Sequence, residues 1–148
     1  MQYYLSTFDE LSNHELYQLL KARVDVFVVE QACPYPELDD NDQAAMHYFI
    51  KDGENIVAVV RILPSGTRYD VPSIGRVLVT EGYRGHGYAR ELLVKSIEFI
   101  QNEWKEKRIR LQAQVYLEEF YASLGFERIS EEYLDDNIPH VDMIWQQK

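Results

Sequence analysis

The sequence predicts a single α/β domain spanning residues 1–148, built on a mixed sheet with the element order βαβββαβαββ. A β-branched segment, a glycine-rich turn, a long amphipathic helix and a further strand follow one another between residues 74 and 115, which is the pattern of a parallel βαβ unit. The dipeptide Asp52-Gly53 lies between two strand-like segments and is a hairpin turn signal. No linker, internal repeat or low-complexity stretch divides the chain, so we expect one hydrophobic core.

The first half of the chain predicts a strand, a helix, a loop and the hairpin. Residues 1–8 are rich in tyrosine and leucine, as in a strand. Ser12 and Glu15 have the spacing of a capping box, and apolar residues then recur at helical spacing, which predicts a helix through about Val28. Two prolines and several carboxylates within residues 33–42 predict a long surface loop. The predicted hairpin strands are His47–Lys51 and Ile56–Leu63.

The second half predicts the βαβ unit, a short helix and two closing strands. The segment Ile74–Val79 reads as a buried strand. Five apolar residues between Tyr88 and Trp104 share one helical face, which predicts a helix over that range. Apolar residues alternate with glutamines in Leu111–Val115, as in a strand. The remaining predicted elements are a helix over Leu117–Leu124, ended by Gly125, and strands over Phe126–Tyr133 and His140–Trp145.

The composition restricts the class of function. The chain has 25 acidic and 15 basic residues and a formal net charge of −10, which argues against nucleic-acid binding. Cys33 is the one cysteine and cannot form an intramolecular disulfide. The first residues lack the pattern of a signal peptide, and no apolar stretch approaches the roughly 18–20 residues that cross a bilayer. We therefore expect a cytoplasmic protein without a membrane anchor.

The segment Arg84-Gly85-His86-Gly87-Tyr88-Ala89 connects a predicted strand to the long predicted helix. Its glycines allow a tight turn, and the first amides of a helix have no internal partners, so the segment can bind an anion such as a diphosphate. By its glycines alone it is equally compatible with an ordinary strand-to-helix turn. It is not a Rossmann turn, because the third glycine and the following acidic residue are missing.

A second segment follows the fifth strand, where Leu117, Phe120, Tyr121 and Leu124 form one apolar stripe of a short helix. The spacing places Tyr121 in the core. A buried phenol still requires a hydrogen-bond partner, and this one would lie near a ligand held by the glycine turn.

In this order, the two segments resemble the motifs of the GNAT superfamily of acetyl-CoA-dependent N-acetyltransferases. That superfamily has a strand, a Gln/Arg-x-x-Gly-x-Gly/Ala loop, a helix, a splayed strand and a short helix with a Phe-Tyr-x-x-x-Gly-Phe run. The corresponding segments are Val77–Val79, Arg84–Ala89, Tyr88–Trp104, Leu111–Val115 and Phe120–Phe126. Four further stretches resemble the ElaA-like branch of the superfamily: Val26–Tyr35, Gly75–Val77, Ala113–Gln114 and Ile138–His140.

The resemblance implies a GNAT-like fold whose mixed sheet splays between the fourth and fifth strands, with helices on both faces. It also implies an enzyme that moves an acetyl group from acetyl-CoA to a primary amine of a small molecule or peptide, by direct attack on the thioester and without a metal. The amides of the 84–89 loop would hold the diphosphate of acetyl-CoA, and the pantetheine arm would pair with the fourth strand. The implied cofactor-binding residues are Val77, Leu78, Val79, Arg84, Gly85, His86, Gly87, Tyr88, Ala89, Gln114, Phe120 and Tyr121.

The chemistry implied for Tyr121 is a hydrogen bond to the leaving thiolate. A phenol with a pKa near 10 is a weaker acid than a thiol with a pKa of about 8.5, so stabilisation matters more than full proton transfer. The attacking amine must first lose a proton, because an alkylammonium with a pKa near 10 is charged at neutral pH. Four residues are candidates for the base, each with a plain structural alternative as a solvated charge or a core histidine: Glu30, His47, Glu81 and His140.

The acidic and aromatic loop after the first helix is the candidate rim of the acceptor site. Its carboxylates at 39–42 lack the ligand spacing of a calcium loop, so they are expected to be solvated or to attract a cationic amine. Nothing near Cys33 lowers a thiol pKa, which disfavours a cysteine nucleophile. The candidate rim residues are Gln31, Cys33, Tyr35 and Asp39.

A rival function is a non-catalytic acyl-CoA-binding or protein-interaction domain that keeps the fold without the chemistry. The intact glycine loop and Tyr121 favour the enzyme. Exposed strand edges near the C-terminus would allow a homodimer. The sequence leaves the acceptor amine and the oligomeric state open.

Overall fold

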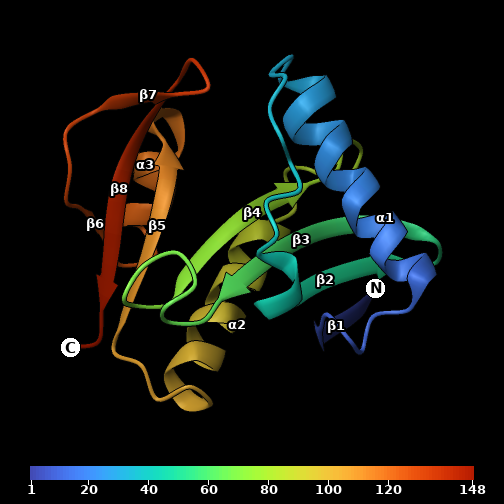
Figure 1. Cartoon of the computed structure of the whole chain (residues 1–148), viewed down its shortest axis with the longest axis horizontal. Coiled ribbons are helices and arrows are strands. Elements are labelled where there is room, and N and C mark those ends of the chain that lie inside the picture. Colours follow the sequence, from blue (N-terminus) through green and yellow to red (C-terminus); the bar gives the residue numbers. More distant parts are fainter.

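Eight strands form one mixed sheet in the computed structural model, which describes residues 1–148 (Figure 1). Their order across the sheet is β1-β2-β3-β4-β5-β8-β6, and β7 pairs with β8. The strands are β1 (Gln2–Thr7), β2 (Met46–Asp52), β3 (Asn55–Leu63), β4 (Ser73–Val79), β5 (Arg108–Gln114), β6 (Phe126–Arg128), β7 (Tyr133–Asp135) and β8 (Ile138–Gln146). The α-helices are α1 (Asn13–Arg23), α2 (Tyr88–Asn102) and α3 (Glu118–Ala122), with 3₁₀ turns at Asp42–Ala44 and Val115–Leu117.

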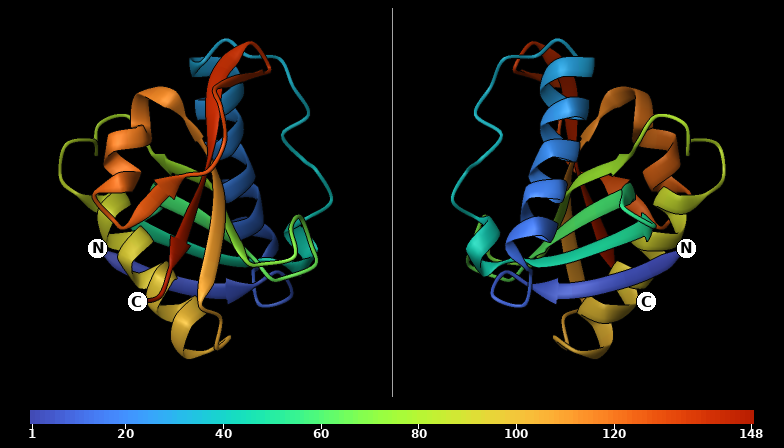
Figure 2. Two further views of the ribbon diagram at one scale, coloured as in Figure 1. Left: turned by 90° about the vertical axis from the view of Figure 1, so that its left-hand side faces the viewer. Right: turned by 90° about the vertical axis from the view of Figure 1, so that its right-hand side faces the viewer.

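The two long helices cover opposite faces of the sheet, as predicted (Figure 2). Leu19 of α1 belongs to a buried cluster that contains Phe49 of β2. Leu93 of α2 belongs to a different, larger cluster that contains Ile50, the next residue of β2. Side chains alternate across a strand, so these two neighbours mark the two faces of the sheet. None of the helices is both long and apolar enough to span a bilayer.

The first helix begins at the predicted capping box. The hydroxyl of Ser12 accepts a hydrogen bond from the Glu15 amide at 3.0 Å, and the Glu15 carboxylate accepts one from the Ser12 amide at 2.9 Å. The predicted end at about Val28 is wrong in detail, because the α-helix ends at Arg23 and a π-helical segment, Val24–Glu30, continues it. That segment is rich in β-branched residues, which crowd a regular α-helix.

The strands β4 and β5 are parallel but separate along their length, which confirms the predicted splay. Their one register pair joins Ser73 to Arg110, and the Arg110 amide donates to the carbonyl of Pro72 at 3.0 Å. Beyond this point the two strands diverge (Figure 1). Over most of their length, the facing edges of β4 and β5 therefore form no hydrogen bonds with each other.

The C-terminal strands differ from the prediction. The segment 126–133, predicted as one strand, contains β6 and the first residue of β7, with 129–132 outside the sheet. Between them, the Ser130 hydroxyl accepts a hydrogen bond from the Asp142 amide of β8 at 2.9 Å. This side-chain bond replaces the backbone bond that a continuous strand would make there. Both short strands pair with β8, which adds one strand to the predicted order.

Candidate active site

A cleft with a volume of about 470 Å³ opens where β4 and β5 separate. One wall is β4, and the other consists of β5 and the segment around α3. Ala89 and Phe120 line it on the side of α2, whereas Glu30 and Tyr35 line it on the side of α1. The cleft therefore reaches both faces of the sheet.

The β4 wall presents an unpaired strand edge with a β-bulge. On the edge that pairs with β3, Gly75 lies opposite Arg61. Three residues further along β4, Leu78 lies opposite Val59, only two residues back on β3. The extra β4 residue coincides with a φ of 50° at Arg76, and such a bulge turns backbone groups out of the ladder. A glycine inside a strand pattern, here Gly75, is the sequence signal for a bulge, and the prediction of a plain strand missed it.

The loop between β4 and α2 has free main-chain amides. None of the amides from Arg84 to Arg90 donates to a protein acceptor, and the first amide of the helix to do so, that of Glu91, donates to the Gly87 carbonyl at 3.0 Å. Gly85 and Gly87 have φ values of 85° and 82°, and a Cβ at either would meet nothing within 4 Å. These amides and the positive end of the α2 dipole together favour an anion here over the plain-turn alternative.

The side chain of Arg84 fixes this loop to its surroundings. Its Nε donates to the carbonyl of Val79, the last residue of β4, at 2.8 Å. Its Nη2 donates to both carboxylate oxygens of Glu30, at 3.0 and 2.8 Å. The end of β4, the loop and the π-helical segment are thus joined beside the cleft, and the Glu30 carboxylate is engaged in an ion pair.

Tyr121 lies at the bottom of the cleft wall formed by α3. It is 6% exposed, and its ring packs edge-on against Phe120 and Phe126 with centroids 5.3 and 6.1 Å away. The residue lines the cleft, and no protein group forms a hydrogen bond with its hydroxyl. Burial raises the pKa of Tyr121, so the phenol is neutral and able to donate a hydrogen bond at neutral pH.

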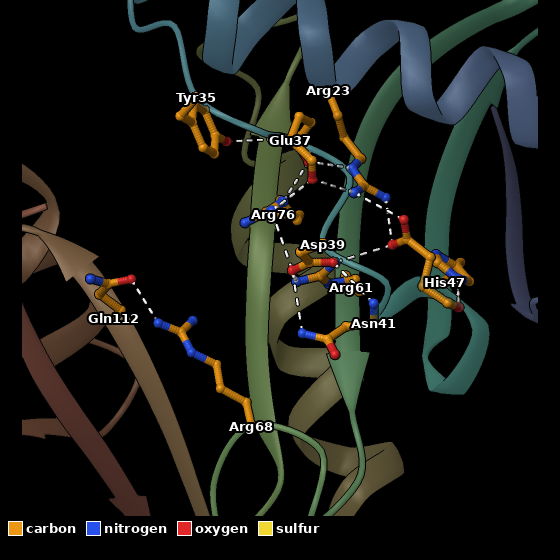
Figure 3. Close-up of polar contacts among 11 residues, drawn as sticks. Arg23, Tyr35, Glu37, Asp39, Asn41, His47, Arg61, Arg68, Arg76 and Gln112 are labelled. Atoms are coloured by element: carbon orange, nitrogen blue, oxygen red, sulfur yellow. Dashed lines mark hydrogen bonds and ion pairs between the residues drawn. The ribbon is translucent and has the colours of Figure 1, made fainter. Parts of the chain in front are cut away.

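A buried ion network lies on the α1 side of the cleft (Figure 3). Arg23, only 1% exposed, donates from Nε to Glu37 and from Nη1 to Asp42, both at 2.8 Å. Arg61 of β3 donates to Asp42 at 3.1 Å and to Asp39 at 2.8 Å. The network consists of three arginines and three carboxylates, so its formal charges cancel: Arg23, Arg61, Arg76, Glu37, Asp39 and Asp42.

This network anchors the segment that was predicted as a solvated surface loop. Asp42 is 6% exposed, so the expectation of solvated carboxylates at 39–42 is wrong for this residue, and Glu37 of the same loop is 3% exposed. Acidic residues beside prolines suggest a surface loop, but their arginine partners lie on distant elements and cannot be inferred from local composition. The result is a rigid connection from α1 to β2 beside the cleft.

The predicted rim residues fall into two groups. Asp39 does not line the cleft, because its carboxylate binds Arg61 and Arg76 in the network. Burial raises the pKa of Asp39, but the hydrogen bond and charge of Arg61 outweigh this and hold the pKa well below its usual range. The other three predicted rim residues line the cleft: Gln31, Cys33 and Tyr35.

The four candidate bases lie in different places. His47 is 1% exposed and binds a main-chain carbonyl outside the cleft, and burial lowers its pKa. Glu81 is in the turn after β4 and does not line the cleft, whereas Glu30 and His140 do. The Nδ1 atom of His140 lies 2.6 Å from the carbonyl of Ile138, which can only accept, so in the neutral ring Nδ1 donates and the lone pair is on Nε2.

Eight of the twelve predicted cofactor-binding residues line the cleft. The other four do not: Gly85, His86 and Gly87 lie in the loop before α2, and Tyr88 is the first residue of α2. Arg68 and Gln112 also line the cleft and were missed, because a contact between residues 44 apart has no local sequence signal. The predicted cofactor-binding residues that line the cleft are Val77, Leu78, Val79, Arg84, Ala89, Gln114, Phe120 and Tyr121.

Comparisons with known proteins agree with this architecture. A family profile described as an acetyltransferase (GNAT) domain matches residues 11–147. Protein ElaA of Escherichia coli (strain K12) is 41% identical over 136 residues, covering 90% of this chain and 89% of that protein. A UPF0039 protein of Schizosaccharomyces pombe is 36% identical over 145 residues, covering 97% of this chain and 95% of that protein.

Solved structures show the same fold. An acyl-CoA N-acyltransferase from Pseudomonas aeruginosa superposes with a TM-score of 0.92 at 31% identity, covering 98% of this chain and 99% of that chain. Escherichia coli ElaA superposes with a TM-score of 0.91 at 37% identity, covering 99% and 100%. The chain therefore belongs to the GNAT acetyltransferase family, in its ElaA-like branch.

Proposed function

We propose that this protein transfers an acetyl group from acetyl-CoA to a primary amine of a small molecule or peptide. The observation that carries the proposal is the run of unpartnered amides from Arg84 to Arg90, which adjoins the free edge of β4. A diphosphate needs several donors converging on one spot, and an amide-bearing chain needs a strand edge. The protein offers both side by side, because the free edge of β4 lines the cleft and Arg84 and Ala89 of the amide run line it as well.

The residues present fit acetyl-CoA. Gly85 and Gly87 leave the loop open for phosphate oxygens, because nothing lies within 4 Å of a Cβ position at either. Backbone groups of β4 between Ile74 and Val79 face the cleft without a partner strand, so they can pair with the two amides of a pantetheine arm. Once bound, acetyl-CoA supplies an acetyl thioester that an amine can attack.

The protein's own groups then have separate tasks. An N–H donor turned out of the ladder at the β4 bulge stabilises negative charge on the thioester oxygen. The neutral hydroxyl of Tyr121 donates a hydrogen bond to the departing thiolate. We assign the base to His140, because its Nε2 keeps a free lone pair in the cleft lining, whereas the Glu30 carboxylate is bound to Arg84.

The proposal is tested by an amine-dependent transfer assay. Purified protein is incubated with acetyl-CoA and a panel of primary amines, thiol release is followed with a thiol reagent, and products are weighed by mass spectrometry. We expect thiol release that depends on the amine, with one acetyl group added to the acceptor. Binding of CoA without transfer to any amine would instead support the non-catalytic acyl-CoA-binding domain.

A further inference from the structure

We propose that the acceptor amine carries a negatively charged oxygen group, and that Arg68 binds this group in the cleft. The inference rests on the proposed acetyl transfer and names the chemical class of its acceptor. It comes from the balance of charges in the cleft lining and from the way in which Arg68 is held.

Arg68 is the one cleft-lining arginine with no carboxylate within 4 Å, and Gln112 stands between it and the carboxylate of Asp135. Arg61 and Arg76 are paired with carboxylates of the buried network, and Arg84 is paired with Glu30. No carboxylate oxygen lies within 4 Å of the Arg68 guanidinium. The four arginines that line the cleft are Arg61, Arg68, Arg76 and Arg84.

Arg68 is nevertheless held in place across the cleft. It belongs to the loop between β3 and β4, and its Nη2 donates to the side-chain oxygen of Gln112 on β5 at 2.9 Å (Figure 3). The Gln112 nitrogen donates to the Asp135 carboxylate at 2.7 Å, which fixes the amide so that its oxygen faces Arg68. A neutral amide oxygen positions the guanidinium without cancelling its charge, and most of its five N–H donors stay free.

The Tyr69 ring lies close to two guanidinium groups, those of Arg68 and Arg110. The guanidinium of Arg68 lies 5.0 Å from the ring centroid of Tyr69, and the guanidinium of Arg110 lies 4.2 Å from the same centroid. Arg110 forms an ion pair with Asp142 at 3.2 Å. Of the two arginines beside Tyr69, only Arg68 therefore has no carboxylate partner. In a chain with a net charge of −10, an exposed cation that lines the cleft and has no carboxylate within 4 Å is a recognition feature for an anion.

The cleft also carries groups that suit an amine. Asp135, Asp136 and His140 belong to the same lining as Arg68, and neither aspartate has an arginine partner. A molecule with an amine at one position and a carboxylate or phosphate at another matches both sets of groups. A guanidinium group binds a carboxylate and a phosphate in the same way, through paired N–H donors.

The test compares acceptors that differ only in the anionic group. Acetyl transfer is measured for glycine, β-alanine, γ-aminobutyrate and ε-aminocaproate, each beside the alkylamine of the same chain length, and for 2-aminoethyl phosphate. We expect at least one amine with an anionic group to have a kcat/KM about 10- to 100-fold above that of the alkylamine without it. The carboxylate and phosphate arms then show which anion is preferred.

The assignment to Arg68 is tested with three variants. In Arg68→Gln the preference for the amine with an anionic group should disappear through a rise in its KM, with kcat for the matching alkylamine unchanged. Arg68→Lys keeps the charge and should retain part of the preference. Arg108→Gln removes another exposed arginine without a carboxylate partner, outside the cleft, and should behave as the wild type.

The outcomes separate this inference from the proposed function. Equal kcat/KM for amines with and without the anionic group, or a preference that survives in Arg68→Gln, would overturn the inference while acetyl transfer stands. If no amine is acetylated, the proposed function fails, and calorimetric titration of the same amines with an anionic group into the CoA-loaded protein still tests Arg68. Binding that is equal in the wild type and in Arg68→Gln would then overturn the inference.

Discussion

Replacing Tyr121 by phenylalanine lowers the turnover of acetyl transfer by about 100-fold and leaves the affinity for CoA nearly unchanged. The hydroxyl is the only group removed, and it has no partner in the protein, so the edge-on packing with Phe120 and Phe126 survives. Because burial raises the pKa of Tyr121, its contribution is a hydrogen bond to the thiolate as charge develops. That contact exists in the transition state and not in the cofactor complex, so kcat falls and CoA binding does not.

The measurement is kcat from thiol release, together with CoA affinity by calorimetry. Tyr48→Phe is the matched control, since Tyr48 packs on the same core but does not line the cleft, and its kcat should equal that of the wild type. An unchanged kcat in Tyr121→Phe would remove this hydroxyl from the mechanism.

Replacing Arg23 by methionine lowers the free energy of unfolding by about 3–5 kcal/mol, because it leaves buried carboxylates with too few partners. Arg23 is 1% exposed and binds both Glu37 and Asp42, which are themselves buried. The remaining Arg61 and Arg76 cannot supply the missing donors without moving. The loss should therefore include the anchoring of the 33–42 segment beside the cleft.

Chemical denaturation measures the loss, and limited proteolysis shows whether cleavage begins within 33–42. The control is Arg128→Met, which breaks an ion pair with Glu118 at 2.9 Å in which Arg128 is 41% exposed. An exposed pair is worth at most about 1 kcal/mol, so the control should be nearly as stable as the wild type. Equal losses in the two variants would mean that the buried network does not stabilise this region.

The sequence predicted those parts of the fold that are encoded locally. The capping box placed the start of α1, Asp52-Gly53 placed the hairpin, and the apolar periodicity after Gly87 placed α2. The glycine loop and Tyr121 were found because their residues are neighbours in the chain.

The features that escaped prediction depend on contacts between distant segments. In the ion network, Asp42 binds both Arg23 on α1 and Arg61 on β3. Nothing in the sequence around any one of these residues indicates its partners. The tie between Arg68 and Gln112 crosses the cleft in the same way. The break in the predicted 126–133 strand depends on a hydrogen bond between Ser130 and β8. Local composition gives the type of an element, whereas tertiary pairing decides which polar residues become buried.

The central claim is that the free amides before α2 hold the diphosphate of CoA, and calorimetric titration of CoA into matched glycine variants tests it most directly. Gly85→Glu places an anionic side chain in the loop before α2. Gly66→Glu makes the same change at a glycine that also has a φ of 85° and nothing within 4 Å of its Cβ position, but belongs to the loop between β3 and β4. We predict that the wild type and Gly66→Glu bind CoA alike and that Gly85→Glu binds at least about tenfold more weakly. Equal affinity in all three proteins would contradict the claim.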